Sequence, residues 1–478
     1  MSGLSKSRLL AHRQCPKRLW LQVHKPILAP AFDAATQARL DSGNQVGVIA
    51  RALHPGGLLI EAADLRQALR DTAEALLAQP TRPLFEATFE HGGVLVRLDL
   101  LLPAADGYRL IEVKSSTSIK DYHLPDAAVQ AWVARQAGLT IQEVAIGHID
   151  NGFVYPGNGD YRGLLKEVSV DAEIQPLLGD IPQWVAGARS TLDGGEPSIA
   201  PGPQCETPFP CPFLEYCAPP AIATEPGYSV DDLPRGKSLA EQLRTEGYDD
   251  LRDVPVDRLT NPLHQRVQAC AQNGSAYLDP QAKAILGNLP YPRFFIDFET
   301  YAPCVPIWPG TRPYAQVPFQ WSCHVESVDG GLSHQAYLAE GPDDPRRPFT
   351  ESLLSAVRET GPVFVYNAAF ERSRLREMTG LYSPTWRFGS TMSSGASSIC
   401  CPSPASIITT RSSTALGRSR RSCPPSPRKW PTKAWKSPTG RWRRPPSRKY
   451  SIPRRLKTGG RPYAGRSWII AGWIRWLW

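Results

Sequence analysis

The chain has 478 residues, which is enough for about three domains. It contains no apolar run of about 18 residues, and its N-terminal stretch, MSGLSKSRLLAHRQC, lacks the apolar core of a signal peptide. These features argue against a membrane span and against secretion. We expect a cytoplasmic protein, whose cysteines stay reduced unless they bind metal.

The net charge of +9 is unevenly distributed along the chain. Residues 388–478 contain 19 Lys and Arg residues and no Asp or Glu. Because all 45 acidic residues and 35 of the 54 basic ones come earlier, residues 1–387 carry a net charge of −10. The basic balance of the whole chain therefore does not indicate a nucleic-acid-binding surface on its first part.

The first expected elements are two helical stretches and a strand. Residues 5–25 have helical apolar spacing, which Cys15-Pro16 interrupts, and residues 61–79 predict a second amphipathic helix. Leu84–Phe89 then reads as a strand that carries Glu86.

Two apolar runs, Val94–Leu102 and Tyr108–Val113, flank a short turn and predict a β-hairpin. Asp99 lies inside the first run, and Glu112 and Lys114 share one face at the end of the second. Charges in apolar strands are costly unless they are paired or bind a metal. Carboxylate oxygens suit Mg²⁺ or Mn²⁺, and the lysine is placed to orient an attacking water. A salt-bridged hairpin without a metal is the alternative.

This D…E-x-K pattern resembles the PD-(D/E)XK nucleases, and the ending EVKSS is most similar to their RecB-type branch. The resemblance implies an α/β core of the restriction-endonuclease type. It assigns metal binding to Asp99 and Glu112 and a catalytic role to Lys114.

The resemblance also extends to the flanking elements. It places Glu86 near the metal, where a solvated strand glutamate is the alternative. Asp126–Ala137 predicts a helix whose Gln130 stands where RecB-type nucleases carry a catalytic glutamine, although Ala134 replaces the tyrosine expected four residues later. Gln142–Asp150 reads as a further strand, and the order strand, strand, helix, strand suits an α/β nuclease.

Three cysteines, Cys205, Cys211 and Cys217, follow in a Pro-rich stretch, and Cys15 is the only cysteine upstream. Such spacing in a cytoplasmic chain favours metal over disulfides. Four thiolates suit a 4Fe–4S cluster or zinc equally by count, and unrelated free thiols are a third possibility. The arrangement of one cysteine before the expected nuclease core and three after it resembles the iron–sulfur staple of RecB-type nucleases. The resemblance implies a 4Fe–4S cluster.

Residues 223–290 are polar and have a helical pattern that Pro and Gly residues interrupt. They predict a helical connector. A module that touches a nucleic-acid backbone and a plain linker are both compatible with this composition.

A second set of acidic residues begins in the run RFFIDFETY, where Asp297 and Glu299 share one face of an expected strand. Residues 319–326 are expected to pair with it. A helix over 349–359, a strand over 362–367 and a helix from 368 then follow.

The pattern D-x-E, followed by Asn367 and Glu371 at the start of a helix, resembles the DEDD exonucleases of ribonuclease H-like fold. The resemblance implies metal binding by Asp297, Glu299 and Glu371, although Glu371 stands where the family has Asp. No acidic residue follows Glu377, so we expect this half to be truncated and inactive. An ordinary salt-bridged strand edge is the alternative.

The whole arrangement over residues 1 to about 387 resembles a bacterial family with domain of unknown function 2779. We expect a nuclease domain (1–222), a connector (223–290), a partial exonuclease-like domain (291–387) and a disordered tail (388–478). The expected function is metal-dependent hydrolysis of DNA, single-stranded or at ends. A non-catalytic nucleic-acid-binding or structural iron–sulfur protein is the alternative.

The tail itself predicts an out-of-frame translation. It has no acidic residue yet holds seven of the 13 Trp, whereas disordered tails are poor in aromatics. Because Trp is encoded by TGG and every Ile codon begins AT, the Trp468-Ile469 and Trp473-Ile474 junctions give two Asp when read one base early. A basic disordered tail is the alternative. The shifted codons allow the segment around these junctions to contain Tyr-x-x-x-Asp, the closing motif of the DEDD exonucleases. Sequencing the gene tests the hypothesis: an uninterrupted frame whose shifted codons do not yield this motif contradicts it.

Overall fold

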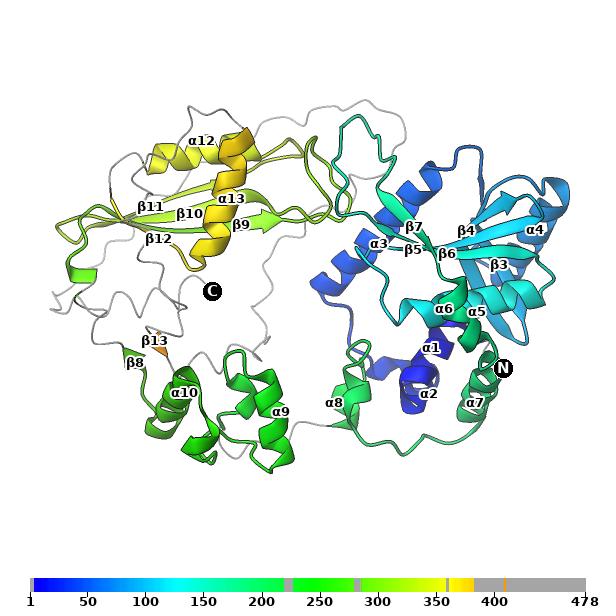
Figure 1. Ribbon diagram of the computed structural model, residues 1–478, viewed down its shortest axis with the longest axis horizontal. Coiled ribbons are helices and arrows are strands. Elements are labelled where there is room, and N and C mark those ends of the chain that lie inside the picture. Colours follow the sequence, from blue (N-terminus) through cyan, green and yellow to red (C-terminus); the bar gives the residue numbers. More distant parts are fainter. Residues whose placement is uncertain are drawn as a thin grey trace. The chain divides into compact units, whose positions relative to one another are not determined.

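The structure, a computed structural model, describes residues 4–218, 227–278, 284, 286–357, 361–381 and 408–409 (Figure 1). All of these residues belong to the compact unit Met1–Gly417. Helices and mixed sheets give an α/β architecture, as expected. No described helix has the length and apolar character needed to cross a membrane. The frame hypothesis concerns residues that, apart from 408–409, lie outside the described ranges.

A seven-stranded mixed sheet forms the first part of the chain, in the order β2-β3-β4-β5-β6-β7, with β1 paired to β4. The expected hairpin is confirmed as two antiparallel strands, although both extend further into the turn than the sequence suggested. Next to it, β6 runs parallel to β5. The strands are β1 (Leu4–Ser5), β2 (Leu58–Leu59), β3 (Leu84–His91), β4 (Val94–Ala104), β5 (Gly107–Lys114), β6 (Ile141–Ile149) and β7 (Leu165–Ser169).

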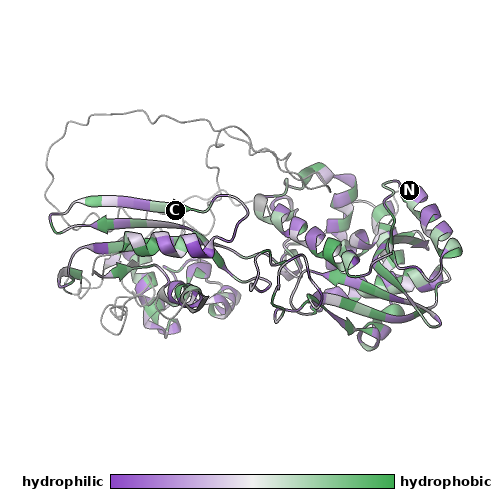
Figure 2. Cartoon of the chain, turned by 90° about the horizontal axis from the view of Figure 1, so that it is seen from above, coloured by the Kyte–Doolittle hydropathy of each residue, from purple (hydrophilic) through white to green (hydrophobic). Residues whose placement is uncertain are grey.

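Helices cover both faces of this sheet. One face packs against α1 (Lys6–Gln14), α2 (Pro16–His24), α4 (Leu65–Ala78), α5 (His123–Gln136), α6 (Asp171–Leu178) and α7 (Ile181–Asp193) around one apolar core. The other face packs against α3 (Ala34–Ala52), which the sequence analysis did not predict. In Figure 2 the helices carry both purple and green residues, as expected for helices with one face on a core.

Local chemistry explains where the first helices begin and end. Cys15 adopts an extended backbone with φ −163° and separates α1 from α2, whose first residue is Pro16. Proline suits this position because the first turn of a helix does not need its N–H. The Asp64 carboxylate accepts a hydrogen bond from the Gln67 N–H at 2.9 Å, which caps α4 and delays its start relative to the expected residue 61.

Three short helices complete this part of the chain. η1 (Pro26–Leu28) lies between α2 and α3, and η2 (Pro203–Cys205) and α8 (Leu214–Cys217) lie in the segment that carries three of the cysteines.

The connector is a small folded module of its own. It contains η3 (Val230–Asp232), α9 (Lys237–Thr245), η4 (Val256–Arg258) and α10 (Pro262–Asn273). Val230, Leu243, Leu251 and Leu259 are fully buried in its separate core. The alternative of a plain linker is therefore wrong for residues 227–278, because apolar side chains that look isolated in a polar sequence converge in three dimensions.

A four-stranded sheet in the order β11-β10-β9-β12 follows. The expected pairing next to Asp297 and Glu299 is confirmed, and the exposed edge strand β11 is an addition that the sequence analysis missed. The elements are β9 (Arg293–Tyr301), β10 (Val317–Glu326), β11 (Leu332–Leu338), α12 (Arg346–Ala356), β12 (Val363–Phe364) and α13 (Ala368–Leu381); β8 (Tyr277–Leu278) and β13 (Ile408–Thr409) form a separate pair.

Candidate active site

Three carboxylate residues stand in one row across neighbouring strands of the first sheet. The β3–β4 register pairs Phe85 with Leu100 and Ala87 with Leu98, which leaves Glu86 facing Asp99 between them. Leu100 also pairs with Ile111 of β5, so Asp99 and Glu112 are the next residues on their strands. The interrupted pairing coincides with a φ of +57° at Glu86, which is a local irregularity of β3.

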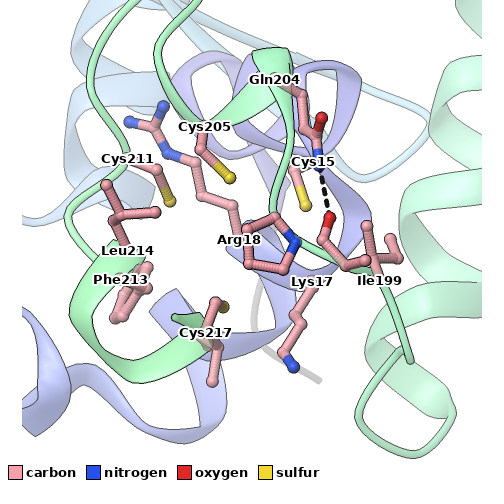
Figure 3. A pocket seen from close by; sticks show the side chains of 13 residues that line it. Cys15, Lys17, Arg18, Ile199, Gln204, Cys205, Cys211, Phe213, Leu214 and Cys217 are labelled. Carbon is pink, nitrogen blue, oxygen red and sulfur yellow. Dashed lines mark hydrogen bonds between the residues drawn. The ribbon is translucent and has the colours of Figure 1, made fainter. Parts of the chain in front are cut away.

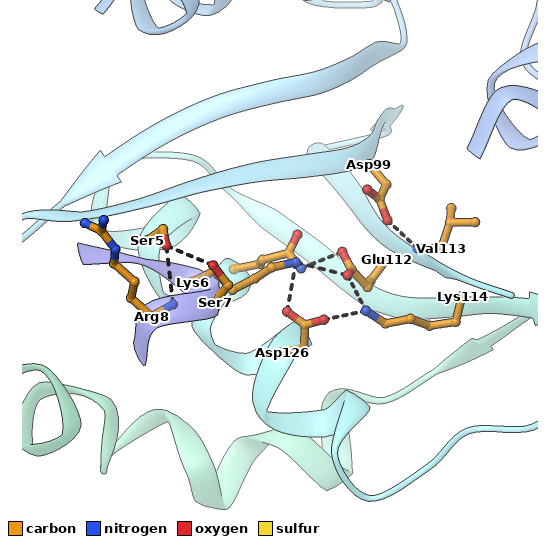
Figure 4. A network of polar contacts seen from close by, with 10 residues as sticks. Ser5, Lys6, Ser7, Arg8, Asp99, Glu112, Val113, Lys114 and Asp126 are labelled. Atoms are coloured by element: carbon orange, nitrogen blue, oxygen red, sulfur yellow. Dashed lines mark hydrogen bonds and ion pairs between the residues drawn. The ribbon is translucent and has the colours of Figure 1, made fainter. Parts of the chain in front are cut away.

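Glu112 is the buried centre of a charged network (Figure 4). Its side chain is 3% exposed, and its Oε1 lies 2.6 Å from Lys114 Nζ and 3.0 Å from Lys6 Nζ. Both lysines also form ion pairs with Asp126 in the first turn of α5, Lys6 at 2.8 Å and Lys114 at a shorter distance. Two lysines from distant parts of the sequence thus bridge the same two carboxylates.

Gln130, one turn after Asp126 on α5, also reaches the centre of the site. Its Nε2 donates to Glu112 Oε2 at 2.5 Å, and its side chain is fully buried. Among the described residues its Oε1 has no hydrogen-bond partner. A buried amide oxygen without a donor is costly, so this atom fits a site that accepts a water or an oxygen-binding cation.

Asp99 is held differently from Glu112. Its Oδ2 accepts a hydrogen bond from the Val113 N–H at 2.7 Å. Burial and the nearby charge of Glu112 raise the pKa of Asp99 well above its usual range. A cation placed between these two carboxylates would favour the ionised form of both.

The charge states of the other groups are set by their mutual contacts. Burial opposes ionisation of Glu112, but the ammonium groups of Lys6 and Lys114 outweigh it and hold the pKa of Glu112 well below its usual range. Burial also opposes charge on the two lysines, yet Glu112 and Asp126 raise the pKa of both. Glu112 is therefore ionised and both lysines are protonated at neutral pH.

Glu86 lies at the edge of this site. Its carboxylate is 30% exposed and lies 3.5 Å from the Arg51 guanidinium of α3. It is next to Asp99 by register, but its contact is with α3, which packs on the other face of the sheet from α1 and α5. It therefore takes no part in the lysine network.

The four predicted cysteine ligands line one pocket together (Figure 3). Cys15 joins α1 to α2, and Cys205, Cys211 and Cys217 come from the segment that contains η2 and α8. The Cys211 N–H donates to the Cys205 carbonyl at 2.7 Å, which fixes the loop between these two residues. Residues 190 positions apart in the chain thus meet at this pocket.

Hydrogen bonds from α1 hold the cysteine loop in place. Gln14 Nε2 donates to the carbonyls of Gln204 and Phe209, each at 2.7 Å. Burial raises the pKa of the Cys211 and Cys217 thiols. A bound metal would reverse that preference, because the thiolate is the ligand.

No group of three or more His, Cys, Asp or Glu side chains in a metal-holding arrangement is found among the described residues. At the charged network, the ammonium groups of Lys6 and Lys114 contact the carboxylate oxygens that a cation would need. The chemistry of both donor sets fits the expected metals: oxygen for Mg²⁺ or Mn²⁺, and four thiols for iron–sulfur or zinc. Their occupancy stays a prediction.

The second sheet presents Asp297 and Glu299 on the face opposite to its core. Phe294, Ile296 and Phe298 alternate with them and are buried against α12 and α13.

Residues 294–394 match the family described as Domain of unknown function (DUF2779). This confirms the predicted family for that stretch. No curated protein matches the chain. The resemblance of residues 1–222 to RecB-type nucleases is not part of this match and stays a prediction.

In the DUF2779 region, Glu371 lies in the first turn of α13. It is 5% exposed, and its Oε1 accepts a hydrogen bond from the Asn367 N–H at 3.2 Å. Among the described residues its Oε2 has no hydrogen-bond partner. Burial raises the pKa of Glu371, and the charge of Asp297 adds to this effect. Of the three predicted carboxylates, Glu371 is thus buried, Asp297 is half-buried and Glu299 is exposed.

Lys6 and Asp126 are site residues that sequence reasoning missed. Asp126 lies in the first turn of α5, which begins at His123, three residues before the expected start. An acidic residue is ordinary in a first helical turn and gives no functional signal. Lys6 is one of several basic residues in the N-terminal helix, and only the pairing of β1 with β4 brings it to Glu112.

Proposed function

We propose that residues 4–218 form a metal-dependent nuclease that hydrolyses phosphodiester bonds, with DNA as the expected substrate. The observation that carries the proposal is the convergence of Asp99, Glu112 and Lys114 on neighbouring strands, with Gln130 hydrogen-bonded to Glu112. Carboxylates from two strands, a lysine two residues after the second and a helical glutamine form a restriction-endonuclease-like set of the PD-(D/E)XK type.

The roles follow from the chemistry of each group. Asp99 and Glu112 would hold Mg²⁺ or Mn²⁺, and Glu86 is the carboxylate next in the row. A bound divalent cation would polarise the phosphoryl oxygen and lower the pKa of a bound water. Lys114 stays protonated, so it orients a water or stabilises negative charge rather than accepting a proton. Gln130 fixes the position of the Glu112 carboxylate.

We also propose a four-thiolate metal centre, a 4Fe–4S cluster with zinc as the alternative, at the pocket lined by Cys15, Cys205, Cys211 and Cys217. It would tie the end of α1 to the segment after the sheet. Since α1 also carries Lys6 at its first residue, such a centre would hold the helix that enters the candidate active site.

For the DUF2779 region we propose a ribonuclease H-like fold that is inactive in this chain. Its carboxylates are Asp297, Glu299 and Glu371, and no further acidic residue follows Glu377. Asp297→Ala is therefore expected to leave DNA cleavage unchanged, because two-metal hydrolysis in the DEDD enzymes needs four carboxylates. Cleavage that survives Lys114→Ala and disappears with Asp297→Ala would contradict this prediction.

The second candidate function is nucleic-acid binding without turnover. It is favoured by the ammonium groups of Lys6 and Lys114, which contact the carboxylate oxygens that a cation would need. The net charge of −10 over residues 1–387 fits poorly with broad DNA binding and leaves room only for a narrow basic channel. A cleavage assay with Mn²⁺ on single-stranded DNA separates the two. Turnover that depends on Lys114 supports the nuclease, and binding without turnover supports the alternative.

A further inference from the structure

Lys6 enters the candidate active site from the N-terminus of the chain. β1 runs parallel to β4 and pairs Leu4 with Val94 and Ser5 with Leu95. On the same strand β4, the β5 pairing begins only at Leu100. The first turn of α1 therefore starts beside the part of the sheet where Glu112 lies, and its first residue is Lys6.

The contacts of Lys6 duplicate those of Lys114. Its Nζ lies 3.0 Å from Glu112 Oε1 and 2.8 Å from Asp126 Oδ1. An ammonium group has three N–H donors. Among the described residues Glu112 accepts a hydrogen bond from this group, and Asp126 contacts it as an ion pair. Donors therefore remain for a ligand.

The exposure of the network decides what kind of ligand meets it. The side chains of Lys6 and Lys114 are 22% and 20% exposed, whereas those of Glu112 and Asp126 are 3% and 11% exposed. Part of each lysine side chain therefore reaches solvent, whereas the two carboxylates are more fully buried. A ligand that approaches from solvent reaches the lysine side chains before the carboxylates, and the positive charge of the lysines favours an anion such as a backbone phosphate.

We propose that Lys6 is a second substrate-contacting lysine of this site, which donates to a phosphate oxygen of single-stranded nucleic acid. The inference rests on the proposed nuclease function and names a residue for it. Glu112 would hold the cation together with Asp99, and Lys6 would then keep its ion pair with Asp126 and have donors for the phosphate. Asp126 thereby acts as a positioning residue for both lysines.

The competing explanation is that Lys6 only neutralises two buried carboxylates. A purely structural lysine changes stability when it is removed, because it leaves Glu112 and Asp126 with one partner fewer. It does not change how binding depends on salt. A lysine that contacts a phosphate releases a counterion on binding, so its loss lowers the salt dependence of the affinity.

The test measures binding of a fluorescent oligodeoxythymidine to the full chain, in EDTA and with Ca²⁺, over a series of salt concentrations. Lys6→Ala is expected to weaken binding about tenfold and to reduce the slope of log affinity against log salt by about 0.7. Lys6→Arg should keep the slope. Lys237→Ala, which removes an exposed lysine of the helical module, should match the wild-type protein. Unfolding midpoints of all variants are measured alongside.

A wild-type slope for a folded Lys6→Ala protein overturns the inference, whatever its change in stability. If Lys6→Ala does not fold, Lys6→Gln carries the same test, since it keeps a donor but removes the charge. If the wild-type protein cleaves DNA and Lys114→Ala abolishes cleavage while Lys6→Ala behaves as wild type, only the role of Lys6 is refuted. If the wild-type protein neither binds nor cleaves DNA, the proposed function fails and the role of Lys6 fails with it.

Discussion

Lys114→Ala is expected to abolish detectable DNA cleavage, with a loss of at least about 10²- to 10³-fold, which is typical of removing one positioned donor that stabilises developing negative charge. The side chain ends among Glu112 and Asp126, with its pKa raised, so the variant removes a fixed positive charge from the centre of the site. The assay compares wild type and variant on single-stranded DNA with Mn²⁺. Lys237→Ala is the matched control, because it removes an exposed lysine elsewhere in the chain.

The two carboxylates are tested in the same assay. Asp99→Ala and Glu112→Ala are expected to abolish cleavage as well, because each removes a carboxylate that the proposed cation needs. Asp99→Asn and Glu112→Gln are the sharper variants, since they keep the size of side chains that are packed inside the sheet. Glu112→Ala would leave Lys6 and Lys114 with only Asp126 as a common partner, which adds a cost in stability. Cleavage by Lys114→Ala at the wild-type rate would show that the nuclease interpretation of the hairpin is wrong.

Cys15→Ala is expected to remove the proposed metal centre and to lower the unfolding free energy of the first part of the chain by several kcal/mol, on the order of what structural thiolate sites contribute. Cys15 links α1 to α2 and lines the same pocket as three cysteines from the later segment. Protein purified without oxygen should be brown, and the variant should be colourless. Iron, acid-labile sulfide and zinc analyses and thermal unfolding are the measurements.

Cys323→Ala is the control for this variant, because it also removes a thiol but one that is buried in the second sheet and does not line the cysteine pocket. It should keep the colour and the metal content. A colourless wild-type protein with one zinc would replace the iron–sulfur assignment by zinc. Wild-type protein that contains neither metal would refute the site.

Local periodicity was sufficient for most of the elements near the site. Alternating apolar residues in Val94–Ala104 and Gly107–Lys114 predicted the hairpin, because burial on one face selects the strand period. The same reasoning predicted α5 and β6, and it placed Glu112 and Lys114 on one face. It did not predict α3, whose Gly-containing sequence has weak helical periodicity and is held by its packing on the sheet.

The site itself was only partly visible in the sequence. Asp99, Glu112 and Lys114 were found because charges interrupt apolar strands, and Gln130 was found through the family resemblance. Lys6 and Asp126 carry no such signal, since both lie in the first turn of a helix, where charged residues are ordinary.

What the sequence determined by itself is therefore the strand pattern, the interrupting charges and the spacing of the cysteines. What only the tertiary structure decided is which of these groups meet. The pairing of β1 with β4 brings Lys6 to Glu112. The segment 203–217 lies against the junction of α1 and α2, which brings its three cysteines to the pocket that Cys15 lines. The physical reason is that periodicity reflects which face of one element is buried. Contacts between residues more than 100 positions apart depend on how several elements pack together.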